Sequence, residues 1–459
     1  MANELLPLTG EVLSRSRRPG FQLWILAAVV GLGVGFLVVS FRISIVYLEV
    51  VFYGATGDQL ARKLTELPAL HRLFAPIVGG ALVTLLLRAG VSAGWGPTPK
   101  PFALSDVVAA RRLRTSINAS TLALRDAFMS LLATIISLGS GASAGREEPA
   151  AHAGASIGML PGRLLGLDLP TRRLLVTMAV AAALSAVLHA PLAALILTRE
   201  LMMPRQRLAL MGPIALASAG GWLTSRAILG DNPVIDIPAA GVIPPEFHVI
   251  ALILTPLFAF TAWAALSFWR WSEDRVLEAA ESYSAPVWML PFAGGMLLGL
   301  ICLVFPHVMG IGYGQVTTAL GGAYAIELTA ILVLAKIAAS AVTFAFRFGG
   351  GQLAPLFFIG AMLGATLGTP IGLPLGDAAG AQVYFGLIGA SVMIAVYLRS
   401  PLFAALLALE LTGDVAAAAG ALACAYLGLT LIRRFTPGLY EQRPASQPLH
   451  AAPADGPVR

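Results

Sequence analysis

Charged residues are scarce in this chain of 459 residues. They make up 12% of it, against about 25% in ordinary soluble domains. So few charges could not cover a soluble surface, and the 57% of hydrophobic residues exclude a disordered chain as well. Cysteine is nearly absent: Cys302 and Cys424 stand in separate apolar runs, which excludes a disulfide framework. The sequence also lacks HExxH, CxxC and P-loop motifs, so it predicts no cofactor or metal and no ATP-driven or redox enzyme.

Long apolar runs dominate what is present, and they predict an all-α integral membrane protein of many passes. The chain holds 48 glycines and 30 prolines, which suit tilted, broken and re-entrant helices that pack closely. Pro191 and Pro401 interrupt two of the runs and should end or kink a helix. We attribute the net charge of +6 to basic cytoplasmic loops and not to nucleic-acid binding.

The composition divides the chain into two membrane halves of similar size. We predict, in order, a cytoplasmic N-terminal segment, a first membrane repeat, a proline-rich linker, a second membrane repeat and a disordered cytoplasmic tail: 1–20, 21–230, 231–247, 248–440 and 441–459. Basic residues before the first apolar run and after the last one place both termini in the cytoplasm.

The two halves share a local pattern, which favours an internal duplication. Glu200 lies nine residues after Pro191, and Glu410 lies nine residues after Pro401. A second echo has the same internal spacing in both halves: Pro149, Gly154 and Gly158 against Pro355, Gly360 and Gly364.

Small residues run out of a membrane segment into charge at 137–149 (SLGSGASAGREEP). A helix that restarts there would begin near the middle of the membrane, where its free N–H groups and dipole favour an anion. Three consecutive ionisable residues at that depth are expensive and therefore functional by default. The second half offers a partner at 347–355 (RFGGGQLAP). The two helix ends could converge on one anion, or the glycines could serve only tight packing.

Five segments, in order along about residues 20–442, resemble motifs of the CLC family of chloride channels and proton/chloride exchangers. GSGASAGREEP resembles the family's segment ending in GREGP, and HAPLAALILTRE resembles its NAPLAGxxFxxEE. GGGQLAPLFFIGAMLG resembles its GGxFAPxxxIGAxxG, and SPLFAALLALELTG resembles its APLxxxxxxxEMT. The final TPGLYE resembles its PLY element.

The resemblance implies transport of chloride or a similar monovalent anion by a voltage-gated channel or a proton/chloride antiporter. It also implies a homodimer of inverted-repeat subunits in a bacterial inner (plasma) membrane, with one pathway per subunit. Glu147 matches the gating glutamate, whose carboxylate competes with the anion and swings away when it is protonated. The positions that match the family's anion-binding ligands are Gly145, Arg146, Gln352, Leu353 and Tyr440.

Two departures from the family bear on the proton. Glu148 stands where the family usually has glycine, and this added carboxylate either faces solvent or is protonated. Glu200 is followed by Leu201, whereas the family's exchangers carry a second acid there that serves the internal proton route. Glu148 and Glu200 are therefore candidate proton relays, and channel and exchanger both stay open.

Two further departures concern the anion. Leu353 replaces the usual phenylalanine, so a backbone donor remains but an aromatic wall is lost. The family's first anion motif, GSGIP, has no clear match, and 94–99 or 101–106 could hold its place. Pro149 is the chloride-type residue, which disfavours the fluoride-selective branch.

Some residues admit a second interpretation. Ser143 lies in a GxSxG pattern, and with His189 it would suit a membrane-embedded serine hydrolase. We favour helix-end hydrogen bonds for Glu200 and Glu410. Lys336, inside an apolar run, could attract anions or pair with a carboxylate or with carbonyl groups.

Overall fold

The computed structural model describes residues 20–93, 124–202, 208–231 and 233–436. Within these residues the regular structure is helical, apart from one isolated bridge between two glycines. The described part of the chain therefore confirms the predicted all-α architecture.

The helices fall into two runs along the chain. The first run is α1 (Phe21–Tyr53), α2 (Gly57–Glu66), α3 (Ala69–Ser92), α5 (Leu124–Gly139), α6 (Glu147–Leu164), α7 (Leu169–Leu188), α8 (Pro191–Met202), η2 (Leu208–Leu210) and α9 (Met211–Leu229). The second run is α10 (Pro245–Ser282), η3 (Val287–Met289), α11 (Leu290–Val304), η4 (Pro306–Val308), α12 (Tyr313–Leu320), α13 (Ile326–Ala345), α14 (Leu353–Gly372), α15 (Ala378–Leu398), α16 (Pro401–Thr412) and α17 (Val415–Phe435). The last residues of the predicted linker belong to α10, because a proline at the first helical position favours a helix start.

Nine helices in the described residues are long and apolar enough to cross a membrane. They differ in burial: α7 and α15 are almost wholly enclosed by protein, whereas α1, α3 and α10 leave more than half of their apolar stretch uncovered. An uncovered apolar helix with its backbone groups paired internally suits contact with lipid. The protein is thus a multi-pass integral membrane protein with two enclosed helices.

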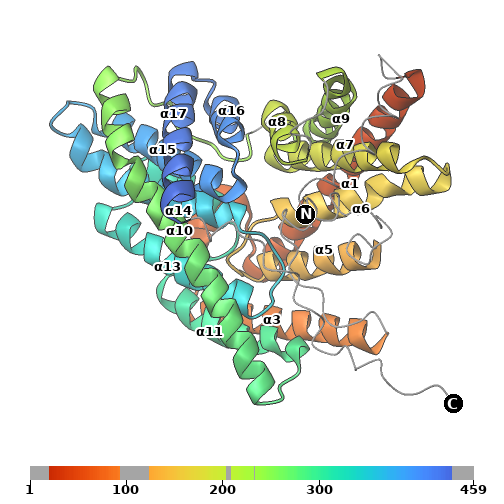
Figure 1. The fold of residues 1–459 in the computed structure, drawn as a ribbon. Helices are drawn as coiled ribbons and strands as arrows, with labels where there is room; N and C mark the ends of the chain where they lie inside the picture. The colour runs from red at the N-terminus through yellow and green to blue at the C-terminus, as the bar shows by residue number, and fades with distance from the viewer. Residues whose placement is uncertain (1–19, 94–123, 203–207, 232, 437–459) are drawn as a thin grey trace.

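Figure 1 shows the two runs as two groups, with α5–α9 on one side and α10 and α13–α17 on the other. Helices of the first run also contact helices of the second run directly: α3 packs against α11, and α8 packs against α16. Between the groups, the starts of α6 and α14 come together.

The glycines repeated at the same spacing in both halves lie at close contacts between helices. Gly154 and Gly158 on α6 face α7, and Gly360 and Gly364 on α14 face α15. A Cβ at any of the four would overlap the neighbouring helix. Small residues at this spacing let two membrane helices approach closely, so α6 packs tightly on α7 and α14 on α15.

The two halves also share their order of elements. In each half a helix ends at a glycine-containing loop, and two long helices follow that loop: α5–α6–α7 and α13–α14–α15. Each second helix ends on a left-handed residue, His189 with φ 58° and Arg399 with φ 57°. A helix of 12 residues follows each, beginning at Pro191 and at Pro401.

Glu200 and Glu410 cap each other's helices. Glu410, near the end of α16, accepts hydrogen bonds from the backbone N–H groups of Leu192 and Ala193, both at 2.8 Å. Glu200, near the end of α8, accepts one from the hydroxyl group of Ser400 at the start of α16. The first-turn N–H groups of α8 gain the partners that a helix start otherwise lacks. The favoured interpretation, helix-end hydrogen bonding, is confirmed for both residues.

Replacing Glu410 with alanine should destabilise the protein by about 1–2 kcal/mol, the usual loss when a helix cap is removed. Alanine keeps α16 helical, so the loss reports on α8 alone. The apparent free energy of unfolding, from denaturant titration in detergent micelles, checks this. Glu281→Ala, at the exposed end of α10, is the control, and an equal effect of both substitutions would contradict the capping role.

Candidate functional site

Two loops run side by side between the two groups of helices. The N–H group of Gly145 donates to the carbonyl oxygen of Gly351 at 2.8 Å, and Gly351 donates back to Gly145 at 2.8 Å. Glu147, the first residue of α6, and Leu353, the first residue of α14, each lie two positions beyond the paired glycine of their own loop. The two helix N-termini therefore converge, which is one of the two alternatives that the sequence left open.

Glycine is required at this junction. Gly350 has φ +131°, a conformation that side chains rarely adopt. A Cβ at Gly351 would overlap the carboxylate of Glu148, and a Cβ at Gly145 would overlap that of Glu147. The glycine runs thus let two backbones and two carboxylates share one small volume.

Neither α6 nor α14 is capped by the side chain of its own cap residue. The cap residues, Arg146 and Gln352, make no such side-chain hydrogen bond within the described residues. Free N–H groups and the positive end of the helix dipole attract negative charge. The junction therefore attracts anions. Two carboxylates of the protein lie there.

Glu147 is completely buried at the start of α6. Its Oε1 accepts a hydrogen bond from the hydroxyl group of Tyr313 at 2.7 Å, while its Oε2 has no hydrogen-bond partner among the described residues. Arg42 lies within electrostatic reach of Glu147, and Arg146 within reach of Tyr313. Glu147 thus lies at a helix N-terminus with a cationic side chain within electrostatic reach.

Glu148 turns the other way and caps α14. It is 2% exposed. Its Oε2 accepts the backbone N–H group of Gln352 at 2.6 Å, and its Oε1 accepts the hydroxyl group of Tyr397 on the last turn of α15. Of the two alternatives open from sequence, a side chain facing solvent is therefore wrong, because α14 and α15 enclose the carboxyl group. The other alternative, a protonated Glu148, stays a prediction.

The structure brings together six of the predicted site residues: Gly145, Arg146, Glu147, Glu148, Gln352 and Leu353. Glu200 is not among them, since it lies at the contact of α8 with α16. Tyr440 and both placements of the first anion motif, 94–99 and 101–106, lie outside the described residues.

Sequence reasoning missed two tyrosines and two ionisable residues of the site. Tyr313 and Tyr397 hold the carboxylates, and they carry no motif of their own. Arg42 and Glu49 lie on α1, and Arg146 is within electrostatic reach of both. Their signal was available, because an ionisable residue inside an apolar run is a functional candidate by default.

Lys336 has carbonyl partners. Its Nζ donates to the carbonyl oxygens of Val308 and Gly310, both at 3.0 Å, and lies 4.9 Å from the ring centre of Phe358. The fully buried cation therefore holds the segment that leads into α12, at whose start Tyr313 stands. Of the alternatives, pairing with carbonyl groups is confirmed.

Ser143 makes its hydrogen bonds with α13. Its Oγ lies 3.0 Å from the Oγ of Ser340, and its N–H group donates to Thr343. His189 is engaged elsewhere, beside Ser225 and the ring of Trp222. The hydrolase interpretation therefore has no support.

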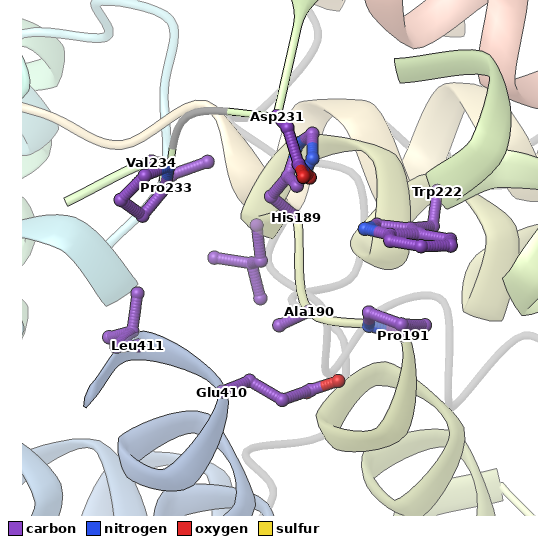
Figure 2. Close-up of a pocket in the computed structure, with 10 residues that line it drawn as sticks. His189, Ala190, Pro191, Trp222, Asp231, Pro233, Val234, Glu410 and Leu411 are labelled. Atoms are coloured by element: carbon purple, nitrogen blue, oxygen red, sulfur yellow. The ribbon is translucent and has the colours of Figure 1, made fainter. Parts of the chain in front are cut away.

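A cavity of about 380 Å³ lies at the break between α7 and α8 (Figure 2). His189, Trp222 and Asp231 line it on one side, and Glu410 lies across from them beside Pro191. The carboxylate of Glu410 accepts a hydrogen bond from the backbone of Leu192 at the start of α8. This cavity is separate from the junction of α6 with α14, whose two carboxylates are buried.

The model of the voltage-gated chloride channel family matches residues 98–433, well over half of the chain. The chain belongs to this family. Membership agrees with the resemblance seen in the sequence motifs and with the expectation that the protein is not an enzyme.

Relatives in the voltage-gated chloride channel family cover most of the chain. A putative chloride channel protein, ClcB-like, of Ralstonia nicotianae is 26% identical over 392 residues, 84% of this chain and 88% of the relative. A voltage-gated ClC-type chloride channel, ClcB, of Shigella flexneri is 25% identical over 401 residues, 86% of this chain and 91% of the relative.

Solved structures share the fold. The structure of a slow cyanobacterial Cl⁻/H⁺ antiporter has a TM-score of 0.78 at 20% identity, over 92% of this chain and 96% of that chain. A CLC-type fluoride/proton antiporter has a TM-score of 0.70 at 18% identity, over 90% and 96%. This chain thus has the fold of these transporters, which confirms the CLC-like inverted-repeat bundle predicted from sequence.

Proposed function

We propose that this protein carries chloride, or a similar monovalent anion, across a membrane as a channel or a proton/chloride exchanger. One observation supports this above the others: α6 and α14 begin side by side at the Gly145–Gly351 pair, with buried charge between them. Helix N-termini attract anions, and ionisable side chains buried at membrane depth are costly and therefore functional by default.

Glu147 acts as the gate. Its carboxylate is buried at the junction and held by Tyr313, so it occupies space and positive potential that a passing anion needs. Neutralising or moving this carboxylate opens the site to the anion. Arg42 and Arg146 then favour the anion for the same reason that they favoured the carboxylate.

The anion is held by backbone donors. The N–H groups of Gln352 and Leu353 stand at the start of α14, and Gly145 and Arg146 stand at the start of α6. Tyr440, which lies outside the described residues, is proposed as a further ligand because it matches the family's PLY element. Backbone N–H groups suit chloride because they offer partial positive charge without a fixed counter-charge that would hold the ion too tightly.

Proton coupling is the open half of the proposal. Glu200 caps α16, a structural role that needs no proton transfer. Leu201 beside it carries no proton, and the family's exchangers use an acid at that place. Glu148 and Glu200 stay candidate relays, and the measurement below separates the two modes.

Membership of the family supports a proposal for the arrangement in the cell. We propose a homodimer in a bacterial inner (plasma) membrane, with both termini in the cytoplasm and one pathway per subunit. Each subunit holds two inverted repeats, and the matching order α5–α8 and α13–α16 supports this duplication.

Paired chloride and proton flux from liposomes tests the proposal. Wild-type protein should release chloride down its gradient. Glu147→Gln removes the charge at constant size, and we expect it to raise passive chloride efflux severalfold and to abolish any linked proton movement. Chloride and pH electrodes follow both ions in the same vesicles.

Glu281→Gln is the matched control, since Glu281 is an exposed glutamate far along the chain from the junction. Proton uptake against chloride efflux in the wild type alone would establish exchange, and chloride efflux without protons would establish a channel. Absence of chloride flux from folded wild-type protein would overturn the proposal.

A further inference from the structure

Glu148 lies where the proposed anion should lie. Its Oε2 accepts a hydrogen bond of 2.6 Å from the backbone N–H group of Gln352, the cap residue of α14. Its Oε1 takes the hydroxyl group of Tyr397. A halide ion and a carboxylate oxygen can both accept hydrogen bonds from these two donors, because each donor carries a partial positive charge. Both cannot hold the site at once.

The neighbouring glutamate, Glu147, supplies an independent observation. Glu147 is fully buried, and its Oε2 has no hydrogen-bond partner among the described residues. A Cβ on Gly145 would overlap this oxygen and would lie 3.2 Å from the backbone nitrogen of Ala354, in the first turn of α14. Two carboxylates therefore crowd one helix N-terminus, and only that of Glu148 is bound to two donors.

We propose that the carboxylate of Glu148 is a tethered anion that occupies the transport site at the start of α14, and that Tyr397 becomes a ligand of the transported anion once Glu148 leaves. This inference rests on the proposed function and deepens it. The gate then consists of two adjacent side chains, Glu147 on the α6 side and Glu148 on the α14 side.

Chloride titration calorimetry on detergent-solubilised protein, in chloride-free buffer, measures the competition. Glu148→Ala should raise the chloride affinity at least tenfold over wild type, because the competing charge is gone. Glu148→Gln keeps the side-chain volume and loses only the charge, so it should raise the affinity in the same direction even if the cavity in the alanine variant collapses. Glu281→Ala should bind as the wild type does.

Tyr397→Phe identifies the new ligand. Combined with Glu148→Ala, it should lower the chloride affinity about tenfold relative to Glu148→Ala alone, the usual effect of losing one hydrogen bond to a charged group. In the wild-type background it should raise the affinity, since there Tyr397 stabilises the competitor. A merely structural tyrosine would not change sign between the two backgrounds.

Three outcomes overturn the inference. One is an unchanged affinity in both Glu148 variants while the wild type moves chloride in liposomes; the proposed function then stands without it. The second is a gain on Glu147→Ala and none on Glu148→Ala, which would make Glu147 the occupant. The third is the same effect of Tyr397→Phe in both backgrounds. Failure of every variant and the wild type to bind or move chloride would instead overturn the proposed function.

Discussion

Replacing Gly364 with valine is expected to leave almost no folded protein. Gly364 lies at the contact of α14 with α15, and a Cβ there would overlap the carbonyl group of Phe385 and approach the Cα of Gly386. These are backbone atoms, so no flexible side chain can give way. Overpacking usually costs about 1–3 kcal/mol and more when the backbone must shift. Because α15 is the most enclosed of the candidate spans, we expect a loss of at least about 3 kcal/mol.

The matched control is Gly33→Val on α1. Gly33 is also helical, but no atom lies within 4 Å of a Cβ built there. The fraction of monodisperse protein after detergent extraction, and the apparent free energy of unfolding, should fall for Gly364→Val and stay near the wild-type values for Gly33→Val. Equal behaviour of the two variants would show that the close packing of α14 on α15 is not needed.

Tyr313→Phe should open the gate. The hydroxyl group of Tyr313 donates to Oε1 of Glu147, whose other oxygen has no partner among the described residues. Phenylalanine keeps the ring against Phe357 and removes only the donor. A hydrogen bond to a charged group contributes about 1.5–3 kcal/mol, so the closed position of the carboxylate should lose roughly 10- to 100-fold in population.

Chloride efflux from liposomes at neutral pH measures the effect, with an expected rise of about tenfold or more. Tyr426→Phe is the control, because Tyr426 is exposed on α17 and its substitution should leave efflux unchanged. A fall in efflux for Tyr313→Phe would mean that the hydroxyl group serves the passing ion and not the closed gate.

Glu148 adds a second carboxylate to the gate proposed for this protein. The family usually has glycine at this place. Here a second buried carboxylate is bound to the facing helix, and Tyr397 supports it. Two helix N-termini meet at this junction, and Arg42 lies within electrostatic reach of Glu147.

Much of this protein could be read from its sequence. Low charge and long apolar runs determined a membrane-spanning helical protein, since a chain with so few charges has no other way to cover its surface. Glycine runs followed by Pro149 and Pro355 determined where helices break and restart, because these residues set backbone conformation locally. The position of Glu147 at a helix start followed from the same local rules.

The tertiary structure alone decided what each carboxylate touches. Tyr313 and Tyr397 reach Glu147 and Glu148 from 166 and 249 residues away, and no spacing rule links residues so distant. Successive residues of an α-helix point about 100° apart. Glu147 and Glu148 therefore leave α6 in different directions, and which direction meets Tyr313 and which meets α14 depends on how the two halves pack.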